Sequence, residues 1–163
     1  MNIDNQSCLK LMWGDRNQRK SNLPFQVCLY INLWLYPAWF FINVVSLDTK
    51  YHSLTNVYKG ISVALFLILS ISESFKLYLG YLGNLAGKIP ELACCWLIST
   101  FVQLPLEMFV LFDRTVSPCY SEMIISTLMV CLLLIEIITG MMALVNLANH
   151  RAKIFYLAHL CHT

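Results

Sequence analysis

The chain of 163 residues is too apolar for a domain that folds in water. Hydrophobic residues make up 58% of it and charged residues only 12%, against roughly 25% charged residues in an ordinary soluble protein. The net charge of +2, with no basic stripe interleaved with aromatic residues, excludes nucleic acid as a partner. The lipid bilayer is therefore the predicted surroundings of most of the chain, and the length allows one domain.

Residues 1–22 are predicted to form a polar N-terminal tail. They are mixed in charge and lack the apolar core of a cleavable signal sequence, so we expect the first membrane helix to direct targeting. That helix is predicted over residues 23–47. Pro37 is expected to kink it, because proline removes a backbone donor. Its aromatic residues Trp34, Tyr36 and Trp39 are expected to pack on neighbouring helices.

The second span is predicted over residues 58–79 and the third over residues 90–112. The glycine-rich stretch 80–89 between them is interpreted as the connecting turn, since glycine adopts backbone angles that other residues resist. Proline and glutamate suit the first turn of the third helix, where Pro90 and Glu91 stand. Pro105 is expected to kink this helix.

The fourth span, over residues 123–147, completes a predicted transmembrane domain at residues 23–148, followed by a C-terminal tail at residues 149–163. Four spans of this length suit a hydrocarbon core about 30 Å thick. Eight lysines and arginines fall in the two tails and near the glycine-rich turn, and three fall in the other loops. The positive-inside rule then places both termini and the turn in the cytoplasm, and the glycosylation sequon at Asn5 is expected to stay unmodified.

Glu73, Glu107 and Glu136 lie within the predicted spans, one on each of three helices. Ionisable residues inside a membrane are candidates for function. Lys76 is three residues from Glu73, so the two are expected to pair while the lysine reaches toward the interface. Glu136 has no local cation and is expected to be protonated or to bond Gln103 or Asn43. Different predicted depths argue against one shared carboxylate site.

No catalytic constellation is recognisable, because a nucleophile needs an adjacent base and an orienting group, and the four histidines lie in loops or tails. His159, Cys161 and His162 have no second ligand cluster, so no metal site is predicted. Of the seven cysteines, four lie in apolar runs, where cysteine packs as a small hydrophobe. We therefore expect no enzyme activity, no cofactor, no metal and no small-molecule substrate.

The central part of the chain resembles the transmembrane protein 17 family, which is related to the transmembrane 216 and 80 proteins. The resemblance extends over residues 27–112. It is carried mainly by Leu77-Tyr-Leu-Gly-Tyr-Leu-Gly-Asn-Leu85, Lys88, Pro90-Glu-Leu-Ala93 and Gln103-Leu-Pro-Leu106. Glu107 departs from the apolar residue expected there.

The resemblance implies a four-span protein of the ciliary transition zone, belonging to the tectonic-like membrane complex. Such proteins support the diffusion barrier at the ciliary base, ciliogenesis and hedgehog signalling. The implied partners are tectonics, B9-domain proteins and related tetraspan proteins. The candidate interaction residues are Glu73, Gly80, Tyr81, Gly83, Asn84, Lys88, Pro90, Glu91, Gln103, Pro105 and Glu136.

The leading hypothesis is thus a non-enzymatic membrane scaffold, with the stretch from Gly80 to Glu91 as its cytoplasmic contact surface. The alternative is a small channel or transporter subunit that uses Glu73, Glu107 and Glu136 together with Gln103.

Overall fold

A computed structural model describes residues 22–51, 56–112 and 120–162, and this part of the chain is almost entirely helical. Four helical stretches are long and apolar enough to cross a membrane, which confirms the predicted all-α fold with four spans. The elements are α2 (Leu23–Tyr51), α3 (Asn56–Ala86), α4 (Ile89–Leu97), the π-helical segment η1 (Ile98–Gln103), α5 (Leu104–Phe112) and α6 (Tyr120–His162). The third span consists of α4, η1 and α5.

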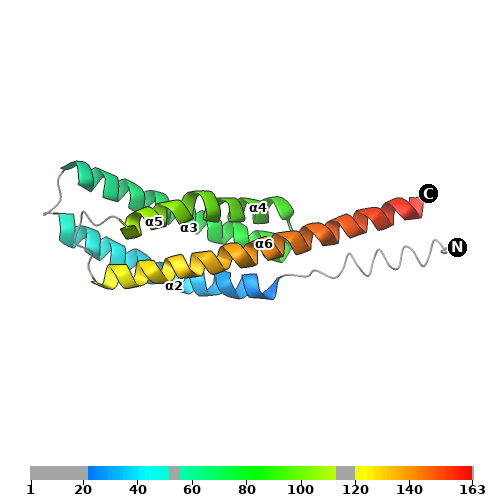
Figure 1. The fold of residues 1–163 in the computed structure, drawn as a ribbon, viewed down its shortest axis with the longest axis horizontal. Coiled ribbons are helices and arrows are strands. Elements are labelled where there is room, and N and C mark those ends of the chain that lie inside the picture. The colour runs from blue at the N-terminus through cyan, green and yellow to red at the C-terminus, as the bar shows by residue number, and fades with distance from the viewer. Residues whose placement is uncertain (1–21, 52–55, 113–119, 163) are drawn as a thin grey trace.

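The spans run alternately up and down the bundle, and each packs on two neighbours. Helix α2 contacts α3 and α6, while α4 contacts α3 and α6, so the third span lies diagonally opposite α2. The start of α2 and the turn between α3 and α4 lie at the end of the bundle from which α6 projects (Figure 1). Which of the two ends faces the cytoplasm stays a prediction.

Two apolar clusters fill the bundle, one toward each end. The first includes Phe25, Leu29, Leu77 and Leu92, and the second is built around Trp39, Leu69, Ile125 and Met129. Buried polar residues separate them along each helix. On α2 the buried positions Phe25, Asn32, Trp39 and Ser46 recur every seven residues, as in a left-handed helical bundle.

The glycine-rich stretch 80–89 is not the connecting turn that the sequence predicts. Helix α3 continues to Ala86, and Gly87 alone adopts a left-handed backbone with φ of 62°. Gly83 instead lets α3 approach the next helix, since a Cβ atom there would lie 2.6 Å from the Leu92 backbone nitrogen. Packing against α4 therefore continues the helix through residues that glycine content alone assigns to a loop.

Helix α6 is much longer than its predicted span of 123–147. Its 43 residues correspond to about 64 Å at 1.5 Å per residue, twice the hydrocarbon thickness of about 30 Å. The predicted C-terminal tail is thus helical as far as His162. Arg151 on this extension donates to the Gly87 carbonyl oxygen at 3.1 Å, which ties α6 to the turn between α3 and α4.

A π-helical segment lies just before Pro105, and the kink expected at Pro105 stays a prediction. Leu104 donates its backbone N–H to Ser99 five residues earlier, and the wider turn precedes a residue that has no N–H of its own. Helix α2 continues through Pro37 as one helix, so the kink expected there stays a prediction.

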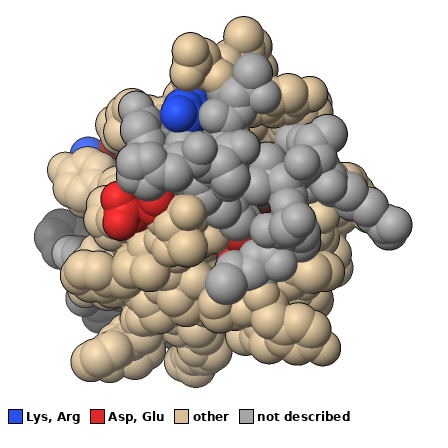
Figure 2. All heavy atoms as spheres, turned by 90° about the vertical axis from the view of Figure 1, so that its left-hand side faces the viewer, with Lys and Arg blue, Asp and Glu red and all other residues tan. Residues whose placement is uncertain are grey.

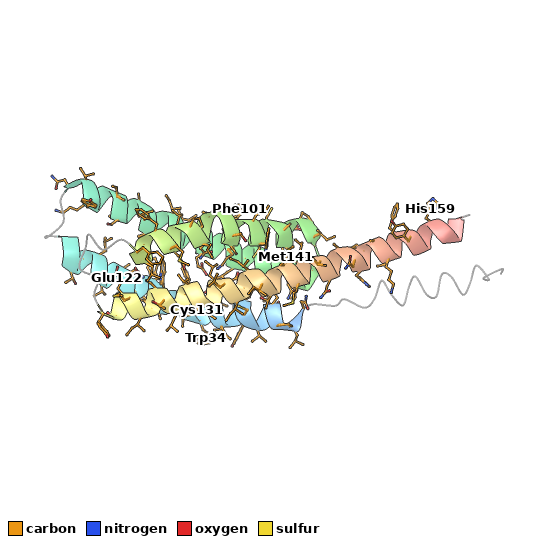
Figure 3. All side chains as sticks on the ribbon, in the orientation of Figure 1. Trp34, Phe101, Glu122, Cys131, Met141 and His159 are labelled. Atoms are coloured by element: carbon orange, nitrogen blue, oxygen red, sulfur yellow. The ribbon has the colours of Figure 1, made fainter. Side chains whose placement is uncertain are left out.

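The outer surface of the spans is apolar. In each span only 22–33% of the most apolar window is buried, which leaves most of those side chains to face lipid. Trp34 and Phe101 point away from the bundle from α2 and the third span (Figure 3), and about 70% of each side chain is exposed. The expectation that Trp34 packs on another helix was wrong, whereas Trp39 is buried as expected. Seen from the end opposite the α6 projection, the described side chains are mostly uncharged, with a few acidic and basic ones among them (Figure 2).

We expect Gly83→Ala to destabilise the protein by about 1–3 kcal/mol, because the new methyl group overlaps the Leu92 backbone and α3 must move away from α4. Thermal unfolding in lipid nanodiscs would measure this. Gly60→Ala, on the same helix, is the matched control, since a Cβ atom at Gly60 meets nothing within 4 Å. Equal stability of the two variants would contradict the close packing of α3 and α4.

Candidate functional site

A cluster of four polar residues lies between the two apolar clusters; we call Asn32, Glu73, Lys76 and Glu136 the polar layer. The Lys76 Nζ atom lies 3.0 Å from Glu73 Oε1 and 3.1 Å from Glu136 Oε2. Asn32 Nδ2 donates to the same Glu136 oxygen at 3.0 Å. One ammonium group therefore joins two carboxylates, and the contacts connect α2, α3 and α6.

The polar layer is closed to solvent and lipid. Each of its four residues is at most 2% exposed, and Lys76 is fully buried. Transferring an ion from water into such surroundings costs several kcal/mol, which only close pairing offsets. The expectation that Lys76 reaches toward the interface was therefore wrong. Lys76 must therefore be left out of the positive-inside count. Seven basic residues then remain on the predicted cytoplasmic side against three on the other side, so the predicted orientation does not change.

The prediction that depth separates Glu73 from Glu136 was also wrong, because both contact Lys76. The error came from the predicted end of the second span. A helix that ends at residue 79 places Glu73 near the interface. Helix α3 continues to Ala86, so Glu73 lies about 20 Å of helix from that end and reaches the depth of Glu136.

The third span contributes a second group of buried polar residues. Ser99 and Gln103 of η1 are 1% exposed and Glu107 of α5 is 6% exposed. The Gln103 side chain lies beside the Glu107 carboxylate, which is within electrostatic range of Glu73 and Lys76. Ser99 donates to the Cys95 carbonyl oxygen at 2.9 Å. All three predicted intramembrane carboxylates therefore face one interior region, contrary to the sequence-based expectation.

Further side-chain contacts join the helices at each end of the bundle. Asn84 receives the Asn22 backbone N–H at 3.1 Å and donates to Gln26 Oε1 at 2.7 Å, which fastens the start of α2 to the end of α3. At the other end Ser46 donates to Glu122 Oε2 at 2.7 Å. Asn84 thus has an internal structural partner, although the sequence offered it as a contact for another protein.

The structure divides the candidate interaction residues into two groups. The interior group, which holds the helices together, consists of Glu73, Gly80, Gly83, Asn84, Gln103 and Glu136. The outer group consists of Tyr81, Lys88, Pro90 and Pro105. Glu91 lies between the two groups and pairs with Lys88 at 3.3 Å.

Asn32 is the main residue of the site that sequence reasoning missed. Its signal is positional, since it lies seven residues after Phe25 and seven before Trp39, on the buried face of α2. Asn43, offered as a partner of Glu136, instead donates to the Trp39 carbonyl oxygen at 2.8 Å. Among the residues that the structure describes, no three histidine, cysteine or acidic side chains are placed to hold a metal ion.

The fold and the polar layer define a helical multi-pass membrane protein with four spans. A family model named Transmemb_17, described as "Predicted membrane protein", matches residues 27–133. The chain belongs to this transmembrane protein 17 family.

Curated relatives agree with this assignment. The chain is 36% identical over 137 residues to transmembrane protein 17B of Danio rerio, covering 84% of this chain and 72% of that protein. It is 34% identical over 144 residues to transmembrane protein 17 of Homo sapiens, covering 88% and 73%. Transmembrane protein 17A of Xenopus tropicalis is 38% identical over 136 residues, covering 83% and 73%. No solved structure is significantly similar.

Replacing Lys76 by methionine should destabilise the protein by about 3–5 kcal/mol, because two buried carboxylates lose their shared cation. Lys88→Met is the matched control. Its side chain is 56% exposed in its pair with Glu91, and exposed pairs contribute about 0–1 kcal/mol. Thermal unfolding in nanodiscs compares the two variants, and similar losses in both would show that the Lys76 bridge does not hold the bundle together.

Proposed function

We propose that this protein is a non-enzymatic membrane component of the tectonic-like complex at the ciliary transition zone. In this role it supports the diffusion barrier at the ciliary base, ciliogenesis and hedgehog signalling. Its membership of the transmembrane protein 17 family carries the proposal, because the resemblance in the central spans implies that role. The implied location is the ciliary membrane, with both termini and the turn at Gly87 in the cytoplasm.

The contacts of the buried polar residues support a scaffold role. Glu73 and Glu136 both contact Lys76, and each of the three residues is at most 1% exposed. The outer surface offers contacts of another kind, since Tyr81 is 56% exposed and Leu85 49% exposed on the last turns of α3. Together with the exposed Lys88, they form a mixed aromatic, apolar and basic surface beside the turn, which we call the turn surface.

Tectonics, B9-domain proteins or related tetraspan proteins are the proposed partners of the turn surface. An exposed aromatic residue and an exposed cation near the same end of α3 suit a partner that approaches at the interface between lipid and cytoplasm. The neighbouring glycines do not belong to this surface, because Gly80 and Gly83 pack against other helices of the same chain.

One observation favours a small channel or transporter subunit as the second candidate function. Glu73, Glu107 and Glu136 face the same interior region, as the carboxylates of an ion pathway would. Purified protein in liposomes would show a pH-dependent ion flux that Glu136→Gln abolishes. Absence of flux from protein that retains its helical spectrum would eliminate this candidate.

In ciliated cells, the tagged protein should form a narrow band between a basal-body marker and an axoneme marker. The double variant Tyr81→Ala with Lys88→Glu should weaken copurification of tectonics at least several-fold while lowering thermal stability only slightly, because both side chains are exposed and an exposed pair such as Lys88–Glu91 contributes about 0–1 kcal/mol. Quantitative copurification and imaging would measure this.

The matched control is Phe101→Ala, since Phe101 is an exposed aromatic residue on another span. It should leave tectonic recovery unchanged. A diffuse plasma-membrane or reticular signal, with cilia forming normally in cells that lack the protein, would contradict the proposed location and role. Unchanged recovery of tectonics with the double variant would contradict only the assignment of the turn surface as the contact site.

A further inference from the structure

The polar layer has one negative charge too many for its surroundings. Two carboxylates, Glu73 and Glu136, share the single ammonium group of Lys76. An unbalanced ion at this depth is strongly unfavourable, and buried groups avoid it by becoming neutral. The same residues also lack hydrogen-bond donors, because Glu73 Oε2, Glu136 Oε1 and Asn32 Oδ1 are buried without a partner.

The Asn32 side chain is an independent sign that something is bound here. It is 98% buried, and its Nδ2 atom is fixed inside the polar layer by the bond to Glu136. Its amide also lies beside the Glu73 carboxylate. Its Oδ1 atom has no hydrogen-bond donor, and a buried carbonyl oxygen without a donor is unfavourable.

We propose that the polar layer is a binding site for one proton, held on the Glu73 carboxyl group and shared with Asn32 Oδ1. With this proton the layer is neutral, since Lys76 then pairs with Glu136 alone. The Glu73 O–H donates to Asn32, Asn32 Nδ2 donates to Glu136, and Lys76 donates to the same carboxylate. One proton thus removes the excess charge and gives Asn32 Oδ1 a hydrogen-bond donor.

A proton suits the site better than a metal cation does. The position between the two carboxylates is already occupied by the Lys76 Nζ atom, about 3 Å from each. A bound Na⁺ or Ca²⁺ would need several oxygen ligands around the same point and would be repelled by the ammonium group. Within the described part of the chain, no ligand group for a metal is assembled.

Glu73 is the residue that takes the proton, because Glu136 is better stabilised as a carboxylate. Glu136 Oε2 accepts hydrogen bonds from both Asn32 and Lys76. Glu73 has Lys76 at 3.0 Å and the Asn32 amide nearby, but neither of its oxygens accepts a well-directed hydrogen bond. Hydrogen bonds from amide and ammonium groups favour the charged form of the group that accepts them.

The other titratable groups that face the layer leave this balance unchanged or add to the negative charge. Cys28 of α2 and Cys95 of α4 are within electrostatic range, and both are ordinarily neutral thiols at neutral pH. Glu107 of α5 is a further carboxyl group within electrostatic range of Glu73. The Glu107 carboxyl group lies beside Gln103. Because Glu107 could give an acid signal of its own, it must be replaced in any experiment that detects the proton on Glu73.

Infrared spectroscopy of protein labelled with carbon-13 at the glutamate carboxyl groups distinguishes acid from carboxylate. The protein is studied in nanodiscs at neutral pH in an E107Q background, so that Glu107 contributes nothing. We expect an acid C=O band in E107Q alone. E73Q should abolish it, and E136Q should abolish it as well, because Glu73 and Lys76 then form a neutral pair.

Lys76→Met in the same background should increase the acid band about twofold, because each carboxyl group left without a cation takes up a proton. Asn32→Leu should shift the band frequency, because the Glu73 hydroxyl loses its acceptor. Asn32→Leu does not change the charge of the polar layer, so it can test the proposal if E136Q fails to fold. Circular dichroism and gel filtration would confirm the fold of each variant.

Four results would overturn the proposal. Absence of an acid band from E107Q would mean that both carboxylates are ionised. Persistence of the band in E136Q would mean that Glu73 is neutral for a reason other than the shared cation, and an unshifted band in Asn32→Leu would exclude the bond to Asn32. Loss of the acid band when the choline salt of the buffer is replaced by a Na⁺ salt would identify a metal cation as the occupant.

Discussion

The structure depends on the Lys76 ammonium group, which lies between carboxylates from its own helix and from α6. Within a bilayer an uncompensated charge costs far more free energy than a poorly packed methyl group. This contact therefore allows little displacement of α3 along α6. Asn32 adds α2 to the same contact. Three of the four spans are thereby fixed at one depth, and the apolar clusters on either side pack in the register that this depth sets.

The apolar clusters cannot set that register alone, because lipid tails are as apolar as leucine and no hydrophobic force draws the helices together. Close packing and hydrogen bonds must do so instead. Gly83 allows the backbone of α3 to approach Leu92, and Trp96 donates to the Ile137 carbonyl oxygen of α6 at 3.1 Å. These contacts attach the third span, which reaches the interior through Ser99, Gln103 and Glu107.

Hydropathy predicts the number and the approximate limits of the spans, since the length of an apolar run is set by the bilayer. It does not predict which face of a helix is buried, because both faces are apolar. Glycine at positions 80 and 83 therefore suggested a turn, whereas both residues pack inside the bundle. Lys76 was assigned to the interface for a similar reason, because its two carboxylate partners come together only in the folded bundle.

The division between buried and exposed faces of the helices also limits where a partner can bind. Every ionisable side chain described here at mid-bundle depth bonds or faces another polar group of this chain, so the interior leaves little for a second protein to contact. The outer faces of the spans and the turn surface remain, together with the part of α6 that projects beyond the bundle and carries Phe155 and Tyr156, each about 70% exposed. A protein with short loops and a self-contained polar interior is suited to act through these outer surfaces. For such a protein, partner specificity must come from exposed aromatic and basic residues at the membrane interface, since its buried charges already determine its fold.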